Sequence, residues 1–184
     1  MFARDYEEVM MGRIVEHIGS ELLWAQIGNS MGWELRANET VIGSVLAEGK
    51  FLSNAAAKCE DGSWKFKRVG ALKANISIIG MDTGIEIALF KKNALNRNGS
   101  ILIHKEKKFT LGTNFLMSEY GVAHEKESII TLSNVTRYPI LSSKLKIYPN
   151  AVNIPELPWL VLFSWYLAVM QHFDLAFNTA VAAG

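Results

Sequence analysis

The sequence predicts a mainly β fold, a closed antiparallel β-barrel around a buried hydrophobic helix near the C-terminus. Two observations lead to this fold class. Residues 33–148 contain short strand-like segments separated by tight turns, without helical segments between them. Residues 157–170 form an uncharged run that is apolar on every side, so it has to be enclosed by protein or by lipid. A sheet of many strands has to curl, split or close, and a wide barrel needs such a helix to fill it.

The first 30 residues carry a helical pattern. Acidic residues stand at the start of the chain, and apolar residues then recur at helical spacing: Met10, Ile14, Ile18 and Leu22. This spacing predicts an amphipathic helix from about Tyr6 to Ile18, with Gly19 as its break.

The strand-like region follows, with its turns marked by sequence. Asp61-Gly62 is a strong hairpin signal, and Asn38-Glu39 and Asn98-Gly99 mark other turns. The expected strands lie within residues 33–36, 41–46, 54–59, 63–69, 74–79, 85–90, 100–104, 108–111, 120–123, 128–132 and 144–148. Alternation along them predicts an apolar inner face that is drawn from Trp64, Phe66, Ile76, Ile78, Ile85, Ile87, Leu89, Ile101, Ile103, Phe109, Leu111, Ile130 and Leu132.

The start of the central helix is also marked. Pro155 and Pro158 suit the first helical turn, where a missing N–H does no harm. Asn153 suits the cap position, and Glu156 suits the positive end of the helix dipole. We therefore expect the central helix to span residues 153–177.

The length of the apolar run favours burial in protein over a membrane span. A helix that crosses a bilayer takes ~20 apolar residues, whereas the uncharged run here stops at Gln171-His172 and Asp174 follows. Membrane insertion of residues 157–177 is the alternative, because Phe173 and Phe177 continue the apolar character.

The totals of the chain indicate one domain. Its 184 residues suffice for one sizeable core, so we expect a single domain over residues 1–184. Within it, residues 1–30 form an N-terminal segment, residues 33–148 the strand meander and residues 153–177 the central helix.

The charge is small in sum but uneven along the chain. The formal net charge of +1 argues against a nucleic-acid binder. Residues 1–50 carry 4 basic and 8 acidic side chains, residues 51–110 carry 11 and 5, and residues 111–184 carry 4 and 5. A basic block of this kind suits anionic partners, although a solvated face is the simpler interpretation.

The cysteine usage and the N-terminus indicate a cytoplasmic protein. Cys59 is the single cysteine, so no disulfide within the chain is expected and a reducing compartment is favoured. The first eight residues contain acidic side chains and lack the apolar core of a secretory signal. Any membrane contact is expected to be peripheral or to involve the C-terminal helix.

The order of elements over residues 33–177 resembles the tubby-like barrel superfamily, which includes the tubby C-terminal domain, the phospholipid scramblases and the plant LURP-one-related proteins. The segments that carry the resemblance run from Asp61 to Gly70, from Gly84 to Phe90, from Gly99 to Ile103 and from Lys108 to Leu111, followed by the apolar helix. The resemblance implies a twelve-stranded barrel around a central helix. It also implies association with membranes or phosphoinositides in some members, and no established enzyme chemistry in many.

Two features of scramblases are missing. Cys59 stands alone where scramblases carry a cysteine cluster, and an acidic calcium-binding loop near the last helix is missing, with only Asp174 close to where it would lie. Lipid scrambling is therefore not expected.

Lysines form the candidate binding site. Lys65 and Lys67 alternate with Trp64 and Phe66, so both should project from the outer face of one strand. The full set of candidates for anion or lipid binding is Lys65, Lys67, Lys91, Lys92, Lys105, Lys107 and Lys108. If they converge, they form a basic patch for anionic headgroups. The alternative is that outward lysines keep the sheet soluble.

Catalytic, metal and cofactor motifs are missing from the sequence. His17, His104, His124 and His172 are scattered without metal-ligand spacing, and there is no nucleophile elbow, Walker loop or dinucleotide fingerprint. Cys59 has no partnered base and is expected to be a buried small residue. We therefore expect a protein that is not an enzyme and that takes no metal or cofactor.

Three functional interpretations remain at this stage. The first is a non-enzymatic binding or scaffold module whose basic outer face contacts anionic phospholipid or a protein partner. The second is a carrier that holds a small apolar ligand in a cavity beside the helix. The third is a membrane protein tethered by residues 157–177.

Overall fold

The computed structural model describes residues 12–49, 52–70, 74–93, 97–137 and 140–182. Within them the chain forms, in order, η1 (Ile14–His17), β1 (Leu22–Gln26), β2 (Gly32–Ala37), β3 (Thr40–Glu48), β4 (Asn54–Cys59), β5 (Gly62–Val69), β6 (Asn75–Gly80), β7 (Glu86–Lys92), β8 (Gly99–Ile103), β9 (Glu106–Thr113), β10 (Tyr120–His124), β11 (Glu127–Ser133), β12 (Ser143–Ile147), η3 (Pro149–Ala151) and α1 (Leu157–Ala182).

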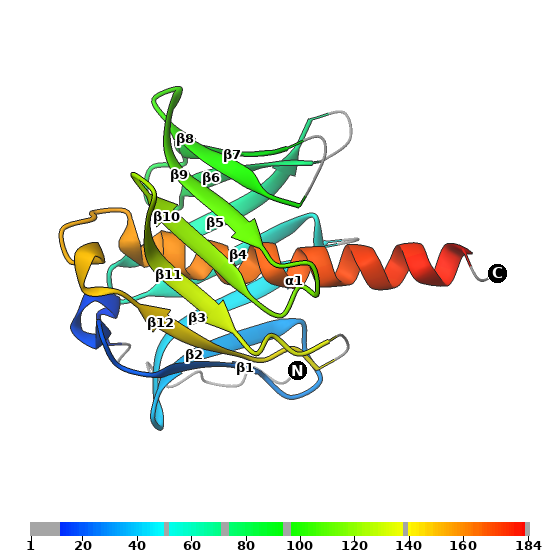
Figure 1. The fold of residues 1–184 in the computed structure, drawn as a ribbon, viewed down its shortest axis with the longest axis horizontal. Helices are drawn as coiled ribbons and strands as arrows, with labels where there is room; N and C mark the ends of the chain where they lie inside the picture. The colour runs from blue at the N-terminus through cyan, green and yellow to red at the C-terminus, as the bar shows by residue number, and fades with distance from the viewer. Residues whose placement is uncertain (1–11, 50–51, 71–73, 94–96, 138–139, 183–184) are drawn as a thin grey trace, which may run out of the picture.

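The twelve strands form one closed antiparallel barrel, which confirms the predicted fold class (Figure 1). Each strand pairs with the strand before and after it in the chain. β1 pairs with both β2 and β12 and so closes the ring, with Leu22 opposite Leu145. Closure matters because an open edge of such a sheet would present unpaired backbone groups to other chains.

α1 lies along the axis of the barrel and extends beyond the strands at its C-terminal end (Figure 1). Every side chain from Trp159 to His172 is buried. Trp165 stacks on Trp24 of β1, with ring centroids 5.3 Å apart, and meets Trp33 of β2 edge-on at 6.2 Å. The apolar character all round the helix is therefore explained by contact with strands on every side, as predicted.

The strand directions assign each loop to one end of the barrel. We call the end from which the C-terminal part of α1 emerges the exit end, and the end where α1 begins the opposite end. Because the strands alternate in direction, the loops β1–β2, β3–β4, β5–β6, β7–β8, β9–β10 and β11–β12 lie at the exit end. The remaining hairpin loops and the β12–α1 connection lie at the opposite end.

The prediction for the N-terminal segment is wrong where the structure describes it. The predicted helix from Tyr6 to Ile18 lies partly outside the described residues, and its described part is the short 3-10 turn η1. Leu22, which extended the helical spacing, begins strand β1 instead. The physical reason is closure: without β1 the edges of β2 and β12 would be open, and Trp24 would not reach Trp165.

The inner face is largely as predicted, but β7 has the other register. Ala88 and Phe90 are buried, whereas Ile85 precedes the strand and is 62% exposed. The pairing of β6 with β7 shifts by one residue after Ile78. A bulge of this kind reverses which side chains face inward, and alternation along β7 alone does not reveal it.

The helix begins and ends later than predicted, at Leu157 and Ala182. Two polar contacts fix its position within the barrel. The hydroxyl of Tyr166 donates to the carbonyl of Leu52 at 2.8 Å. The guanidinium of Arg68 donates two hydrogen bonds to the carboxylate of Asp174, at 2.6 and 3.1 Å.

Candidate functional site

The structure places the lysines of β5 on the outer face, as the alternation predicted. Lys65 and Lys67 flank Phe66, whose side chain is fully buried against α1. Lys67 is exposed and Lys65 is half-buried. Neither Lys65 nor Lys67 lines the groove over β8–β11.

The seven predicted lysines do not form one patch. A register row leads across the outer face from Lys67 to Lys107 through Ser77, Leu89 and Leu102. Four strand spacings separate the two lysines, which is about 19 Å along the sheet. The row therefore spreads these charges over the wall of the barrel.

Most of the lysines lie toward one end of the barrel or the other, although Lys91 and Lys105 both line a hollow of about 500 Å³ over β7 and β8. Lys91 and Lys92 are the last two residues of β7, which ends at the exit end. Lys105 occupies the β8–β9 turn at the opposite end, and Lys107 and Lys108 follow it on β9. A ligand small enough to fit one end therefore meets only part of the predicted set.

Lys108 has a structural role. The pairing of β8 with β9 shifts between Ile101 and Leu102, which leaves Lys108 as an extra residue on β9. Its ammonium donates to the carboxylate of Glu156, just before α1, at 2.6 Å. This ion pair ties the wall of the barrel to the start of the central helix, and Lys108 also lines a hollow together with Lys107.

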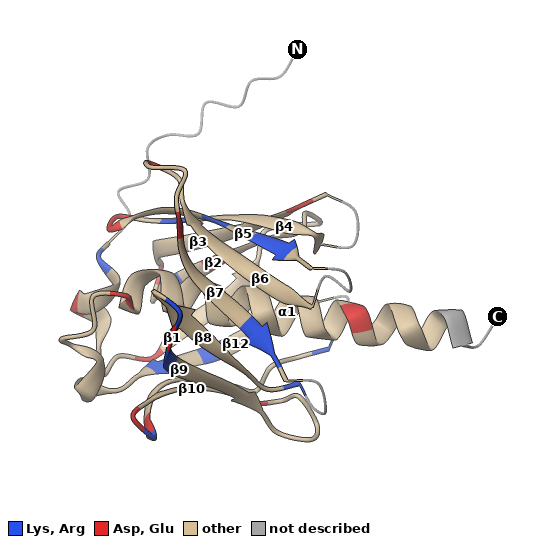
Figure 2. Cartoon of the chain, turned by 90° about the horizontal axis from the view of Figure 1, so that it is seen from above, with Lys and Arg blue, Asp and Glu red and all other residues tan. Residues whose placement is uncertain are grey.

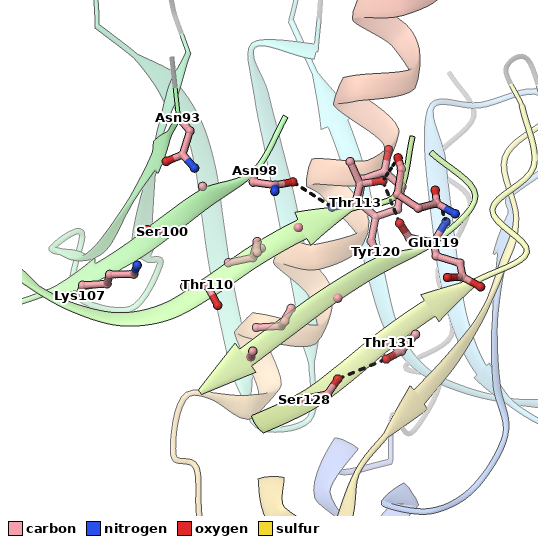
Figure 3. Close-up of a pocket in the computed structure, with 17 residues that line it drawn as sticks. Asn93, Asn98, Ser100, Lys107, Thr110, Thr113, Glu119, Tyr120, Ser128 and Thr131 are labelled. Atoms are coloured by element: carbon pink, nitrogen blue, oxygen red, sulfur yellow. Dashed lines mark hydrogen bonds between the residues drawn. The ribbon is translucent and has the colours of Figure 1, made fainter. Parts of the chain in front are cut away.

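A shallow groove of about 620 Å³ crosses the outer face over β8, β9, β10 and β11 (Figure 3). Gly112 and Gly121 face each other at its centre and expose the backbone. The groove is lined mainly by small and polar side chains: Asn93, Asn98, Ser100, Lys107, Thr110, Thr113, Ser128 and Thr131 are among them. It offers hydroxyls and amides to a polar ligand and one ammonium group, that of Lys107.

Some of these polar groups are already engaged with one another. Asn98 accepts a hydrogen bond from the backbone N–H of Thr113 at 3.1 Å, and the Thr113 hydroxyl donates to the carbonyl of Glu119 at 2.8 Å. These contacts fix the exit-end rim of the groove.

The exit end gathers basic side chains from separate parts of the sequence. The exit-end cations are Lys67, Arg68, Lys91, Lys92, Arg97 and Arg137. Figure 2 shows the basic ends of β5 and β7 on the side from which α1 emerges. Asp174 on α1 is balanced by Arg68. Glu34, Glu48 and Glu119 are the other carboxylates at the described strand ends and loops of this end, and Lys144 near the start of β12 pairs with Glu21.

The loops of the opposite end are mainly acidic. The described loops of this end carry Glu39, Glu60, Asp61, Asp82, Glu125 and Glu156. Lys105 and Lys126 are the basic residues of the same loops. The strand ends next to these loops add the basic residues Arg36, Lys58, Lys107, Lys108 and Lys146 and the acidic residues Glu86, Glu106 and Glu127. The charge is therefore polarised along the axis of the barrel although the sum over the chain is only +1.

A hollow of about 670 Å³ lies at the exit end beside α1. Arg97 and Arg137 line it together with apolar side chains of the β9–β10 loop and of α1. His172 forms its floor, buried, with Nε2 3.0 Å from the carbonyl oxygen of Met117. Burial lowers the pKa of His172, and the two arginines act in the same direction. His172 is thus a buried histidine with a hydrogen-bond partner.

Cys59 is buried, as predicted. Burial raises the pKa of its thiol to about 11, so the reactive thiolate is scarce at neutral pH. Among the residues that the structure describes, no group of three or more histidine, cysteine, aspartate or glutamate side chains is arranged to hold a metal ion.

α1 meets the length and hydropathy expected of a membrane span between Leu157 and Ala180. However, 72% of the most apolar stretch is buried inside the barrel. Core helices of soluble proteins meet the same criterion, so the hydropathy of α1 does not by itself place it in a membrane.

Comparison with known proteins relates this chain to others through its fold. No protein-family model matches the sequence, and no curated protein matches it. The structure is similar to the X-ray structure of a protein from Arabidopsis thaliana, with a TM-score of 0.55 and 9% sequence identity. The match covers 91% of this chain and 99% of the plant protein. At this identity the similarity shows a shared fold and carries no function.

Sequence reasoning missed Arg97, Arg137 and the apolar residues of the exit end. These residues lie in loops, where neither alternation nor helical spacing applies. A usable signal did exist in the strand order. In an antiparallel meander every second loop lies at the same end, so the loops before β8, β10 and β12 had to meet.

Proposed function

We propose that this protein is a tubby-like barrel that acts as a non-enzymatic binding module for anionic membrane surfaces, with the exit end as its contact face. The observation that carries the proposal is the polarisation of charge along the barrel axis. The exit-end cations lie at the ends of β5 and β7 and in the loops before β8 and β12, while the loops of the opposite end are mainly acidic. The proposal narrows the basic outer face expected from the sequence to one end of the barrel.

The charges at the exit end suffice for reversible association. Each basic residue near an anionic membrane surface contributes ~1 kcal/mol. Arg68 is partly neutralised by Asp174, and the other five exit-end cations together would contribute about 5 kcal/mol. Because these side chains are near solvent, the attraction should weaken steeply with salt. The acidic opposite end would be repelled by the same surface, which orients the barrel.

The enclosure of α1 favours this surface function over the two alternatives. The side chains that would cross a bilayer are the ones that the strands surround. Inside the barrel, the space beside the helix contains packed aromatic rings such as Phe66, Phe90 and Phe163, and the hollow beside α1 lies where the helix leaves the barrel.

The test is flotation of the protein with vesicles of phosphatidylcholine alone or with 30% phosphatidylserine (about a third of the lipid), over a range of salt concentrations. We expect binding to the anionic vesicles at low salt and release as salt is raised. Absence of binding to anionic vesicles, or equal binding to both kinds at all salt concentrations, contradicts the proposal.

Paired variants locate the contact face. The variant Lys91→Gln/Lys92→Gln removes two charges at the exit end, and Lys105→Gln/Lys107→Gln removes two near the opposite end. The first should weaken binding by about 2 kcal/mol, or roughly thirtyfold, whereas the second should change it little. Equal losses from both variants would mean that binding follows total charge and not the exit end.

A further inference from the structure

Large apolar side chains project into solvent at the exit end. Phe115 is 93% exposed and Leu116 is 65% exposed, both in the β9–β10 loop. Ile140 in the β11–β12 loop is 71% exposed, and Leu175 and Phe177 on α1 are 44% and 45% exposed. We call these five residues the exit-end apolar cluster. The opposite end also exposes Met81, Ile85 and Val152, but Phe115, Leu116 and Leu175 line one hollow, and such a grouping marks a contact surface.

The β9–β10 loop holds its two exposed residues in a defined conformation. The side-chain oxygen of Asn114 accepts hydrogen bonds from the backbone N–H groups of Ser118 at 2.9 Å and of Glu119 at 3.3 Å. Met117, next to the exposed pair, is buried and its carbonyl oxygen contacts His172. The loop is therefore anchored at its base, and Phe115 and Leu116 project from a fixed turn.

Charge complementarity indicates what this end contacts. Arg97 and Arg137 line the same hollow as Phe115, Leu116 and Leu175. Apolar side chains beside guanidinium groups match the two layers of an anionic membrane, with headgroup phosphates outside and acyl chains below. A second copy of this chain fits less well, since an end-to-end dimer would bring two sets of exit-end cations together.

We propose that the exit end inserts into the membrane, with Phe115 and Leu116 and the emerging part of α1 entering the acyl boundary while Arg97 and Arg137 bind lipid phosphates. This inference rests on the proposed function, because it takes an anionic membrane as the partner. It adds penetration to what would otherwise be electrostatic adsorption. The barrel would stand on the membrane with its axis near the membrane normal, since α1 lies along that axis.

A polarity-sensitive label at position 115 tests insertion. The variant Phe115→Cys carries the fluorophore NBD, and Val152→Cys, an exposed position at the opposite end, is the matched control. Cys59 is buried with a raised thiol pKa, so the introduced cysteine takes the label. With vesicles containing 30% phosphatidylserine (about a third), we expect a blue shift and quenching by doxyl-labelled acyl chains at position 115 and neither at position 152.

The outcomes of this experiment distinguish insertion of the exit end from the proposed membrane binding itself. Flotation without a blue shift at position 115 overturns insertion and leaves the proposed function standing. If the unlabelled protein does not float with the anionic vesicles, both insertion and the proposed function are wrong. A blue shift at both positions indicates adsorption without orientation and contradicts insertion through the exit end. A blue shift without vesicles that grows with protein concentration indicates self-association through the apolar cluster and also contradicts the proposal.

A second measurement uses salt. The variant Phe115→Ser/Leu116→Ser removes only exposed side chains, so its thermal unfolding should match that of the unchanged protein. The serine variant no longer buries two large apolar side chains in the membrane. Its binding to vesicles should therefore weaken roughly tenfold or more, at low and at high salt. The loss in Lys91→Gln/Lys92→Gln should shrink as salt screens the charges. If the serine variant binds vesicles as the unchanged protein does, insertion by the β9–β10 loop is wrong.

Discussion

Replacement of Trp165 by alanine tests whether the helix and strands form one continuous core. Trp165 is fully buried in the part of α1 that the barrel encloses, stacked on Trp24 and edge-on to Trp33. The alanine variant therefore leaves a cavity between the helix and the two strands next to the closure of the ring. The helix itself should tolerate the change, because alanine is the best helix former.

The magnitude follows from burial and ring contacts. Removal of a buried aromatic side chain costs about 3–5 kcal/mol, and the two ring contacts place Trp165 near the upper limit, at about 5 kcal/mol. For a chain of this size each kcal/mol lowers Tm by roughly 2–4 °C, so a decrease of about 10–20 °C is expected. Trp165→Phe should cost far less, since the indole N–H of Trp165 has no hydrogen-bond partner among the described residues.

Urea unfolding followed by far-UV circular dichroism measures the effect without depending on tryptophan fluorescence. The control is Phe115→Ala, which removes an aromatic ring that is 93% exposed and should change stability by about 0.5 kcal/mol or less. A loss below about 2 kcal/mol for Trp165→Ala at an unchanged m-value would mean that the helix is loosely held. The account of a helix-filled barrel would then be wrong.

Three further predictions concern other parts of the barrel. Gly99→Ala should destabilise the protein by about 1–3 kcal/mol, because a Cβ at this position would lie 2.3 Å from the Phe90 ring. The control is Gly121→Ala, which should be neutral because no atom lies within 4 Å of the added Cβ. Thermal unfolding of the two variants measures the difference. The pKa of His172 in the folded protein is below its ordinary value of 6.5, because burial disfavours the charged ring. The stability that His172 contributes should therefore be complete above pH 6.5 and be lost as the pH falls through the folded-state pKa. His172→Gln should flatten this part of a plot of unfolding free energy against pH. Cys59, with a thiol pKa of about 11, should resist alkylation at pH 8 in the folded protein and react at the ordinary rate in urea, as mass spectrometry of the modified protein would show.

The closed barrel and its helix were predictable because both follow from patterns that repeat over many residues. Alternation along the strands and the all-round apolar run of α1 each depend on burial, which sequence reports directly. Single-residue shifts were not predictable in the same way. The bulge after Ile78 and the extra residue Lys108 change which side chains face inward without changing the local composition.

The candidate site was less predictable than the fold. Composition identified the basic block, and alternation placed Lys67 on the outer face. Whether charges converge depends on which loops share an end, and this property arises from strand order over the whole chain. Arg97 and Arg137 are 40 residues apart in the sequence, yet both line the hollow beside His172.

The position of α1 after all twelve strands has a consequence for biosynthesis. Until residues 157–172 leave the ribosome, the emerging sheet has no partner for its apolar inner face, and the contact of Glu21 with Lys144, 123 residues apart, has to wait almost as long. Contacts of such sequence separation form slowly, and partly made chains of this kind are prone to aggregate. The nascent chain should therefore depend on chaperones that shield sheet surfaces until translation reaches the helix.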